Sequence, residues 1–211
     1  MMVKIKSILN NNFFGKKCLL RLDLNIPLSN KGKILDDTRI IESIPTIDYL
    51  LGQSAKVIIL SHIGRPKGKY NEEYSFKPLL NEIGSKLKQE ICFIEYKNLS
   101  KISDIIKSKP NGTLFLLDNI RFNEGEEKND PDFIDFLSSF GDVFVNDGFG
   151  TIHRNHASII GITKKLPSFG GILLEKEILN ITECISIESS NSVAILGGSK
   201  ISDKIPIIEN L

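Results

Sequence analysis

The feature that most constrains this chain is a short apolar run that ends in a cluster of polar and cationic side chains. Residues 57–60, Val-Ile-Ile-Leu, are mostly β-branched, a pattern typical of a strand buried on both faces of a parallel sheet. The loop that follows, residues 61–68, contains His62, Arg65 and Lys67. Because open α/β sheets bind ligands at the carboxyl ends of their strands, this loop is a candidate site for an anion. Taken alone, it is equally well interpreted as a solvated basic loop.

Polar or cationic residues follow other strand-like segments in the same way. They are Asp23 and Asn25 after the apolar segment 17–22, Arg121 after 113–117, and Arg154 after 142–145. Right-handed crossovers bring the carboxyl ends of parallel strands to one edge of a sheet, and we expect Arg39, at the start of the first helix, to face that edge. Each residue alone is better interpreted as an exposed loop residue, but together they predict a basic cleft for a small, multiply negative ligand.

Strand-like and helix-like segments alternate along most of the chain. Helical patterns occupy residues 39–51, where Pro45 predicts a kink or a split into two short helices, and the segment opened by Asp130 and Pro131. Such alternation is the signature of βαβ units. We therefore predict the α/β class, with a Rossmann-like, doubly wound parallel sheet in a three-layer αβα arrangement.

The pattern changes after residue 168, where a long amphipathic stretch predicts a helix. A further strand, residues 193–196, then leads into Gly197 and Gly198, and glycines between a strand and a helix allow a phosphate to approach the backbone. Lys200 and Lys204 fall on one helical face, where they either reach the same anion or are solvated. The motif is weak, because neither a P-loop nor a Gly-x-Gly-x-x-Gly pattern occurs. We predict three parts: a ligand-binding domain at 1–168, an interdomain helix at 169–190, and the start of a second, similar domain at 191–211.

Composition excludes several classes of protein. The 211 residues carry a formal net charge of +1, which gives no overall attraction to nucleic acid or membranes. The chain has no apolar run of membrane-spanning length and no adequate core for a secretory signal, so a cytoplasmic location is expected. The three cysteines are far apart and lack zinc or redox spacing, so no metal site is predicted.

Several motifs of the sequence, taken as a set, resemble the phosphoglycerate kinase family over essentially the whole chain. They are Arg-Leu-Asp-Leu-Asn-Ile-Pro at 21–27, Asp-Thr-Arg-Ile at 37–40, Ser-His-Ile-Gly-Arg-Pro-Lys-Gly at 61–68, Asn-Ile-Arg-Phe at 119–122, Gly-Glu-Glu at 125–127, Val-Asn-Asp at 145–147, His-Arg-Asn-His-Ala-Ser at 153–158 and Gly-Gly-Ser-Lys at 197–200. The resemblance implies reversible phosphoryl transfer between 1,3-bisphosphoglycerate and Mg-ADP, giving 3-phosphoglycerate and ATP in glycolysis. It also implies a monomer that has neither nucleic acid nor membrane as a partner.

The resemblance assigns roles to individual positions. Asp23, Asn25 and His62 would hold the glycerate end of the substrate, while Arg65, Arg121 and Arg154 would bind the phosphate that is not transferred. Substrate contacts are also implied for Leu24, Ile63 and Gly64. Arg39 would meet the transferring phosphoryl group, which Lys200 and Lys204 would reach from the nucleotide side, with Gly197 and Gly198 at the nucleotide. Because the attacking oxygen is already ionised, His62 is expected to donate a hydrogen bond and not to shuttle a proton.

The sequence departs from the family pattern in three ways. Asp118 stands where glutamate is usual and Gly148 where alanine is usual. The larger departure is length, since a complete enzyme is expected to be roughly twice as long, with the glycine-rich adenine and Mg-phosphate loops in the second half. The chain is interpreted as a fragment or a truncated product, with little or no turnover by itself. A non-catalytic binding module for a phosphorylated acid is the alternative, and a basic nucleic-acid binder is disfavoured.

Overall fold

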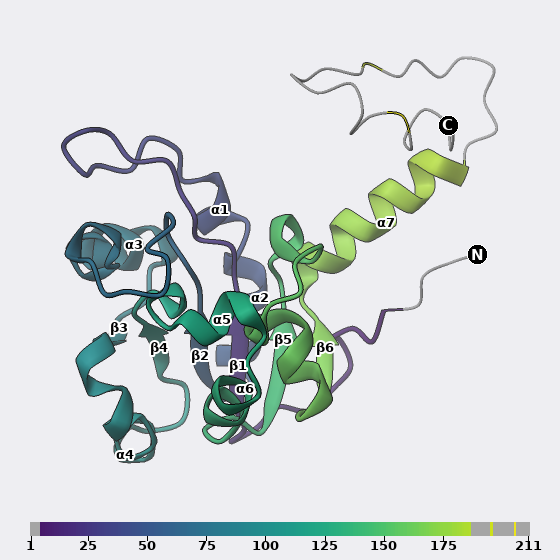
Figure 1. Cartoon of the computed structure of the whole chain (residues 1–211). Helices are drawn as coiled ribbons and strands as arrows, with labels where there is room; N and C mark the ends of the chain where they lie inside the picture. Colours follow the sequence, from purple (N-terminus) through teal and green to yellow (C-terminus); the bar gives the residue numbers. More distant parts are fainter. Residues whose placement is uncertain (1–4, 187–194, 196–204, 206–211) are drawn as a thin grey trace.

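The structure, a computed structural model, describes residues 5–186 together with residues 195 and 205. Its centre is a six-stranded sheet in the order β3-β4-β2-β1-β5-β6, and every neighbouring pair of strands is parallel (Figure 1). The strands are β1 (Lys17–Arg21), β2 (Lys56–Leu60), β3 (Ile91–Ile94), β4 (Leu114–Leu117), β5 (Val143–Asn146) and β6 (Ser168–Gly170). The parallel sheet predicted from the alternating pattern is therefore confirmed.

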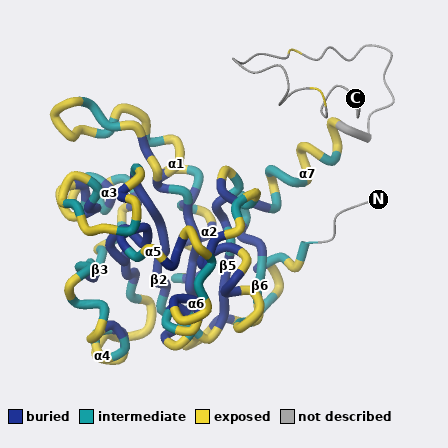
Figure 2. Tube along the Cα trace, viewed as in Figure 1, coloured by how far each residue is buried: buried dark blue, intermediate teal, exposed yellow. Residues whose placement is uncertain are grey.

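Helices cover both faces of the sheet, which explains why the middle of most strands is apolar. The helices are α1 (Thr38–Ile41), α2 (Ile44–Gly52), α3 (Leu80–Leu87), α4 (Ile102–Ser108), α5 (Glu124–Lys128), α6 (Pro131–Ser138) and α7 (Ile172–Ser186). Successive side chains of a strand point to opposite faces. In β1, Cys18 and Leu20 join the core beneath α2 and α3, while Leu19 joins the core beneath α4 and α6. The buried strands lie between exposed helix surfaces in Figure 2.

Two local predictions about helix ends are also confirmed. Helix α1 ends at Ile41 and α2 begins at Ile44, with Pro45 in its first turn, so the helical stretch is split as expected. Helix α6 begins at Pro131, and the Asp130 side chain accepts a hydrogen bond from the Phe133 backbone N–H at 3.1 Å.

The order of the strands places a crevice beside β1. The chain runs from β1 to β2 and onwards to one edge of the sheet, and β5 then returns to the opposite side of β1. Such a switch in strand order is where doubly wound sheets bind their ligands. Helix α7 follows β6 and projects away from the sheet (Figure 1). It lies within the predicted interdomain segment, whereas residues 191–211 lie outside the described residues except 195 and 205, so the domain boundaries stay a prediction.

Within the part of the chain that the structure describes, no helix combines the length and the apolar character that crossing a membrane requires.

Candidate anion-binding site

The loops that follow β1, β2, β4 and β5 meet at the carboxyl edge of the sheet. Backbone hydrogen bonds continue past the strand ends, from Leu22 N to Leu60 O at 3.1 Å and from Asp147 N to Arg21 O at 2.9 Å. The loop after β1 also touches the loop after β2, where the Gly64 N–H donates to Asn25 Oδ1 at 2.8 Å. Residues scattered along the sequence are thus gathered at one edge, as the crossover rule predicts.

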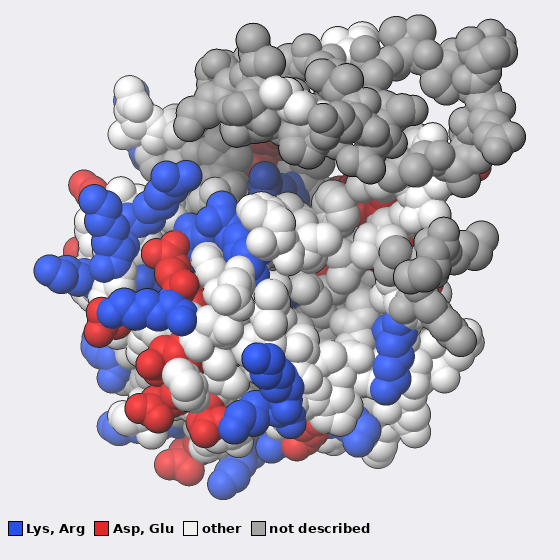
Figure 3. Space-filling model, turned by 45° about the vertical axis from the view of Figure 1, so that its right-hand side comes forward, with Lys and Arg blue, Asp and Glu red and all other residues white. Residues whose placement is uncertain are grey.

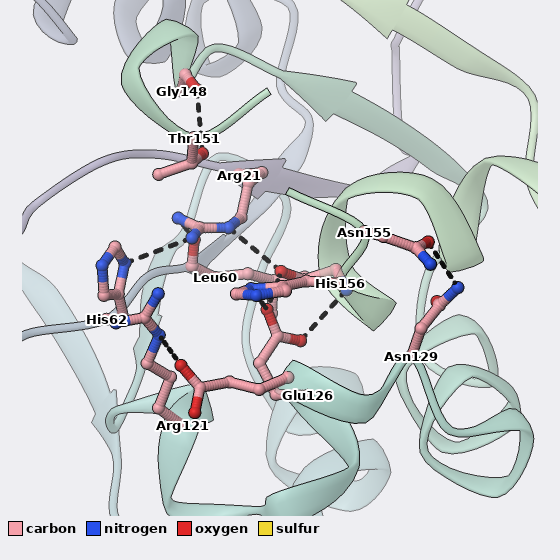
Figure 4. Close-up of polar contacts among 12 residues, drawn as sticks. Arg21, Leu60, His62, Arg121, Glu126, Asn129, Gly148, Thr151, Asn155 and His156 are labelled. Carbon is pink, nitrogen blue, oxygen red and sulfur yellow. Dashed lines mark hydrogen bonds and ion pairs between the residues drawn. The ribbon is translucent and has the colours of Figure 1, made fainter. Parts of the chain in front are cut away.

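Arg21, the last residue of β1, is fully buried, and its guanidinium group is hydrogen-bonded to other groups of the protein. Its Nε donates to Ser158 Oγ at 3.0 Å, and Nη1 donates to the carbonyl oxygens of Leu22 and Leu60. Its Nη2 lies 3.2 Å from Nδ1 of His62 (Figure 4). Each nitrogen of Arg21 therefore has a partner within the protein, so this arginine organises the site from beneath.

His62 follows β2 and is kept neutral by its surroundings. Burial lowers the pKa of the imidazole to about 2, together with the charges of Arg21, Arg121, Arg154 and His156. Of these four groups, Arg21 is in direct contact with His62, at 3.2 Å from its Nδ1. A neutral imidazole can donate one hydrogen bond, in agreement with the expected role of His62.

Arg121 and Arg154 carry buried N–H groups that lack a hydrogen-bond partner. Arg121 Nη1 donates to Gly64 O at 3.1 Å, and Nε lies 3.2 Å from a carboxylate oxygen of Glu127 without hydrogen-bond geometry. Arg121 Nη2 and Arg154 Nε are buried and unpaired. Unpaired buried donors are costly and rare in folded proteins, so these two groups are candidates for binding an anion.

Arg39 and Asp23 form a second group beside this cluster. They are joined by an ion pair, and a cavity of about 240 Å³ that they help to line extends towards Leu173 and Glu177 of α7. Gly150 closes over the pair, because a Cβ there would lie 2.8 Å from Asp23 Oδ2 and 3.7 Å from Arg39 Nη1. Burial lowers the pKa of Arg21, and the negative charges of Glu126 and Asp23 offset part of that shift.

A buried carboxylate, Glu126 of α5, balances the cationic cluster. Its oxygens accept hydrogen bonds from Ser158 Oγ at 2.7 Å and from Ser158 N at 3.0 Å. Nδ1 of His156 lies 3.7 Å from Oε1. Burial by itself would raise the pKa of Glu126, but the neighbouring His156, the charge of Arg21 and the bonds from Ser158 hold it below its ordinary value.

The structure brings together most of the residues that the sequence singled out. His62, Arg121 and Arg154 form one cluster, and Arg65, which is exposed, acts electrostatically on Arg121. Asn25 and Gly64 are bonded to each other, and Ile63 O accepts a bond from the Asn119 side chain at 2.7 Å. Leu24 is a core residue whose N–H donates to Ser61 Oγ at 2.9 Å. Four predicted residues lie outside the described part of the chain: Gly197, Gly198, Lys200 and Lys204.

Sequence reasoning did not assign a role to Arg21, Glu126, His156 or Ser158. A signal was present for Arg21, because an arginine inside the run Leu-Leu-Arg-Leu is expected to be buried and therefore paired. Glu126 and Ser158 carry no comparable signal, since they are 32 residues apart and meet only when α5 packs on the turn at Ala157–Gly161.

Other parts of the described surface fit an anion less well. A cavity of about 330 Å³ lined by Tyr70, Tyr96 and Asp118, among others, contains no buried polar atom without a partner among the described residues. The face in Figure 3 mixes Lys and Arg with Asp and Glu, which does not suit a nucleic-acid backbone. Among the described residues there is also no group of three or more His, Cys, Asp or Glu that could hold a metal ion.

The fold defines a doubly wound α/β protein, and the carboxyl edge of its sheet carries a candidate anion-binding site. The family model described as phosphoglycerate kinase matches residues 8–211. By that match the chain belongs to the phosphoglycerate kinase family, as its motifs suggested.

Relatives and solved structures agree with this assignment. The chain is 43% identical to a phosphoglycerate kinase of Borrelia hermsii over 209 residues, 99% of this chain and 53% of that protein. It is 42% identical to one of Thermosipho africanus over 197 residues. Its structure is similar to the phosphoglycerate kinase of Coxiella burnetii, with a TM-score of 0.84, 35% identity, and coverage of 98% of this chain and 51% of that one. The chain therefore spans about half the length of the curated relatives it matches.

Proposed function

We propose that this part of the protein binds 3-phosphoglycerate and its acyl phosphate, 1,3-bisphosphoglycerate, for reversible phosphoryl transfer to and from ADP. The observation that carries the proposal is the pair of unpartnered, buried N–H groups on Arg121 and Arg154, at an edge where His62 and Arg65 also converge. A phosphate with several acceptor oxygens satisfies such donors better than a single carboxylate does.

The neighbouring residues fit the rest of such a ligand. The phosphate that is not transferred would lie between Arg121 and Arg154, with Arg65 at the open side. The glycerate end would lie towards His62 and Asn25, along the backbone of Leu24, Ile63 and Gly64, with Asp23 beside it. Arg39 would exchange its bond with Asp23 for one with the transferring phosphoryl group.

Catalysis in this arrangement rests on position and charge. Phosphoryl transfer needs little covalent chemistry from the protein, so holding the reactants in line and neutralising the equatorial oxygens supplies most of the rate enhancement. The attacking oxygen is ionised at neutral pH, and His62 stays neutral because burial and the nearby cations lower its pKa to about 2. His62 would therefore act as a hydrogen-bond donor, and no described residue needs to act as general base.

The nucleotide would bind opposite this site, with Gly197, Gly198, Lys200 and Lys204 at its phosphates. Their spacing after an apolar segment supports this assignment, since glycine permits close approach and the lysines lie four apart. Mg²⁺ would arrive with the nucleotide. We also propose that the protein is a cytoplasmic monomer without nucleic-acid or membrane partners.

Calorimetric titrations of the 211-residue chain, one with 3-phosphoglycerate and one with Mg-ADP, test the proposal. Binding of 3-phosphoglycerate is expected, and its absence would contradict the proposed function. Binding of both ligands favours the kinase, whereas binding of 3-phosphoglycerate alone favours the alternative of a non-catalytic module for this chain. Because the chain spans about half the length of its relatives, a coupled turnover assay of the chain alone is expected to show little activity.

A further inference from the structure

The guanidinium group of Arg21 has a partner at each nitrogen, and one of these partners is the ring of His62. Nη2 of arginine always carries hydrogens, because the group is not deprotonated in proteins. Nδ1 of His62, at 3.2 Å, must therefore be the acceptor. In a neutral imidazole the remaining hydrogen is then on Nε2.

The position of Arg21 is in turn fixed through Ser158. The hydroxyl of Ser158 has one hydrogen, and Oγ lies 2.7 Å from Glu126 Oε1 and 3.0 Å from Arg21 Nε. A carboxylate accepts and a guanidinium donates, so the hydroxyl accepts from Arg21 and donates to Glu126. The two bonds at Ser158 Oγ therefore run from Arg21 towards Glu126, while Arg21 donates separately to His62.

Glu126 is well suited to be the fixed end of this relay. It is fully buried, and both of its oxygens accept bonds from Ser158, one from the hydroxyl and one from the backbone N–H. Burial lowers the pKa of Arg21. The negative charge of Glu126 acts against that shift, while the charges of Arg121 and Arg154 add to it. Neither Glu126 nor Ser158 reaches the open side of the site, because both are 0% exposed.

We infer that Glu126, acting through Ser158 and Arg21, positions His62 and holds it as the Nε2–H tautomer. Nε2 has no partner among the described residues and is not one of the buried unpaired atoms, so it is the edge of the ring that faces the ligand space. Glu126 is thus a positioning residue that turns a buried histidine into a fixed hydrogen-bond donor. This inference deepens the proposed function and rests on it only for the identity of the ligand, an oxygen-rich anion.

Nuclear magnetic resonance of the free chain tests the tautomer directly. Long-range ¹H–¹⁵N spectra distinguish a pyridine-like from a pyrrole-like nitrogen, and the His62 signals are assigned by their loss in His62→Asn. We expect Nδ1 of His62 to be pyridine-like and Nε2 pyrrole-like. A wild-type spectrum with the hydrogen on Nδ1 overturns the inference, whether or not any variant folds.

Two variants test the relay itself. Ser158→Ala removes the bridging hydroxyl, and Glu126→Gln places an amide N–H₂ where it competes with Arg21 Nε for that hydroxyl. Both are expected to give mixed His62 tautomers and to weaken 3-phosphoglycerate binding about tenfold. Glu124→Gln is the matched control, because Glu124 lies on the same helix and pairs with exposed Lys128. Folded variants with an unchanged His62 tautomer would show that Glu126 has a structural role alone.

The tautomer measurement tests the relay, and the titration with 3-phosphoglycerate tests the proposed function, so either proposal can be wrong without the other. If wild-type His62 is the Nε2–H tautomer and 3-phosphoglycerate does not bind, the relay stands and the proposed function is wrong. If the ligand binds and His62 carries its hydrogen on Nδ1, the proposed function stands and the relay is wrong.

Discussion

Two buried carboxylates at the same edge of the sheet behave in opposite ways. Glu126 and Asp147 are 0% and 1% exposed, respectively. The pKa of Glu126 is lowered, because the neighbouring His156, the charge of Arg21 and the bonds from Ser158 outweigh burial. Burial raises the pKa of Asp147 to about 6, and bonds from Thr46 and from the backbone of Leu174 and Leu173 offset only part of it.

The contrast shows what keeps a buried carboxylate ionised in this protein. Both groups accept hydrogen bonds, but only Glu126 has an arginine among the causes of its shift. Asp118 supports the same conclusion, since burial raises its pKa although Ser75, Phe76 and Asn119 all donate to it. Hydrogen bonds alone leave the pKa of Asp147 and of Asp118 raised, whereas Glu126 also has the charge of Arg21 nearby.

Removing the cation at Glu126 is expected to have the largest effect. Arg21→Met leaves an unpaired charge in the core, and we expect it to lower the free energy of unfolding by about 3–5 kcal/mol. Adding Glu126→Gln should recover part of the loss, because both charges are then gone. Chemical denaturation measures both changes, with Lys164→Met at an exposed position as control. Equal free energies of unfolding for wild type and Arg21→Met would contradict the claim that Arg21 stabilises the ionised Glu126.

Neutralising Asp147 is expected to raise the free energy of unfolding, whereas Arg21→Met is expected to lower it. The folded chain binds this proton more tightly than the unfolded chain, since the pKa rises from 3.8 to about 6. The stabilisation is present below the unfolded pKa and is lost as pH rises through about 6. Asp147→Asn should therefore be more stable than wild type by up to about 2–3 kcal/mol near neutral pH, with the gain vanishing near pH 4.

Urea denaturation at several pH values checks this expectation. The matched control is Asp48→Asn, at an exposed position of α2. A stability difference for Asp147→Asn that is the same at every pH would contradict the raised pKa.

Crowding Asp147 should have a smaller effect. A Cβ at Gly171 would lie 2.3 Å from Asp147 Oδ1, so Gly171→Ala must displace the carboxylate from the start of α7. We expect a loss of about 1–3 kcal/mol, typical of overpacking, and recovery when Asp147→Ala is added. Gly52→Ala is the control, since nothing lies within 4 Å of a Cβ there. A loss that Asp147→Ala leaves unchanged would locate the strain elsewhere.

The sequence predicted the sheet, the split at Pro45 and the convergence of cationic loops, because these depend on local patterns and on crossover handedness. It did not predict which cations would be free to bind a ligand. The apolar run around Arg21 indicates burial and pairing, but the sequence does not indicate that Arg21 is paired at every nitrogen whereas Arg121 Nη2 is not. That difference depends on Ser158, which lies 137 residues from Arg21 along the chain. No local pattern encodes such a contact.

The central claim is that the free N–H groups of Arg121 and Arg154 hold a phosphate, and calorimetry with two ligands tests it most directly. The affinity for 3-phosphoglycerate is compared with that for glycerate, which lacks the phosphate, in wild type and in Arg121→Met. We expect wild type to prefer 3-phosphoglycerate by roughly tenfold to a hundredfold, and Arg121→Met to lose most of that preference. Equal affinities in wild type, or an undiminished preference in Arg121→Met, would contradict the claim.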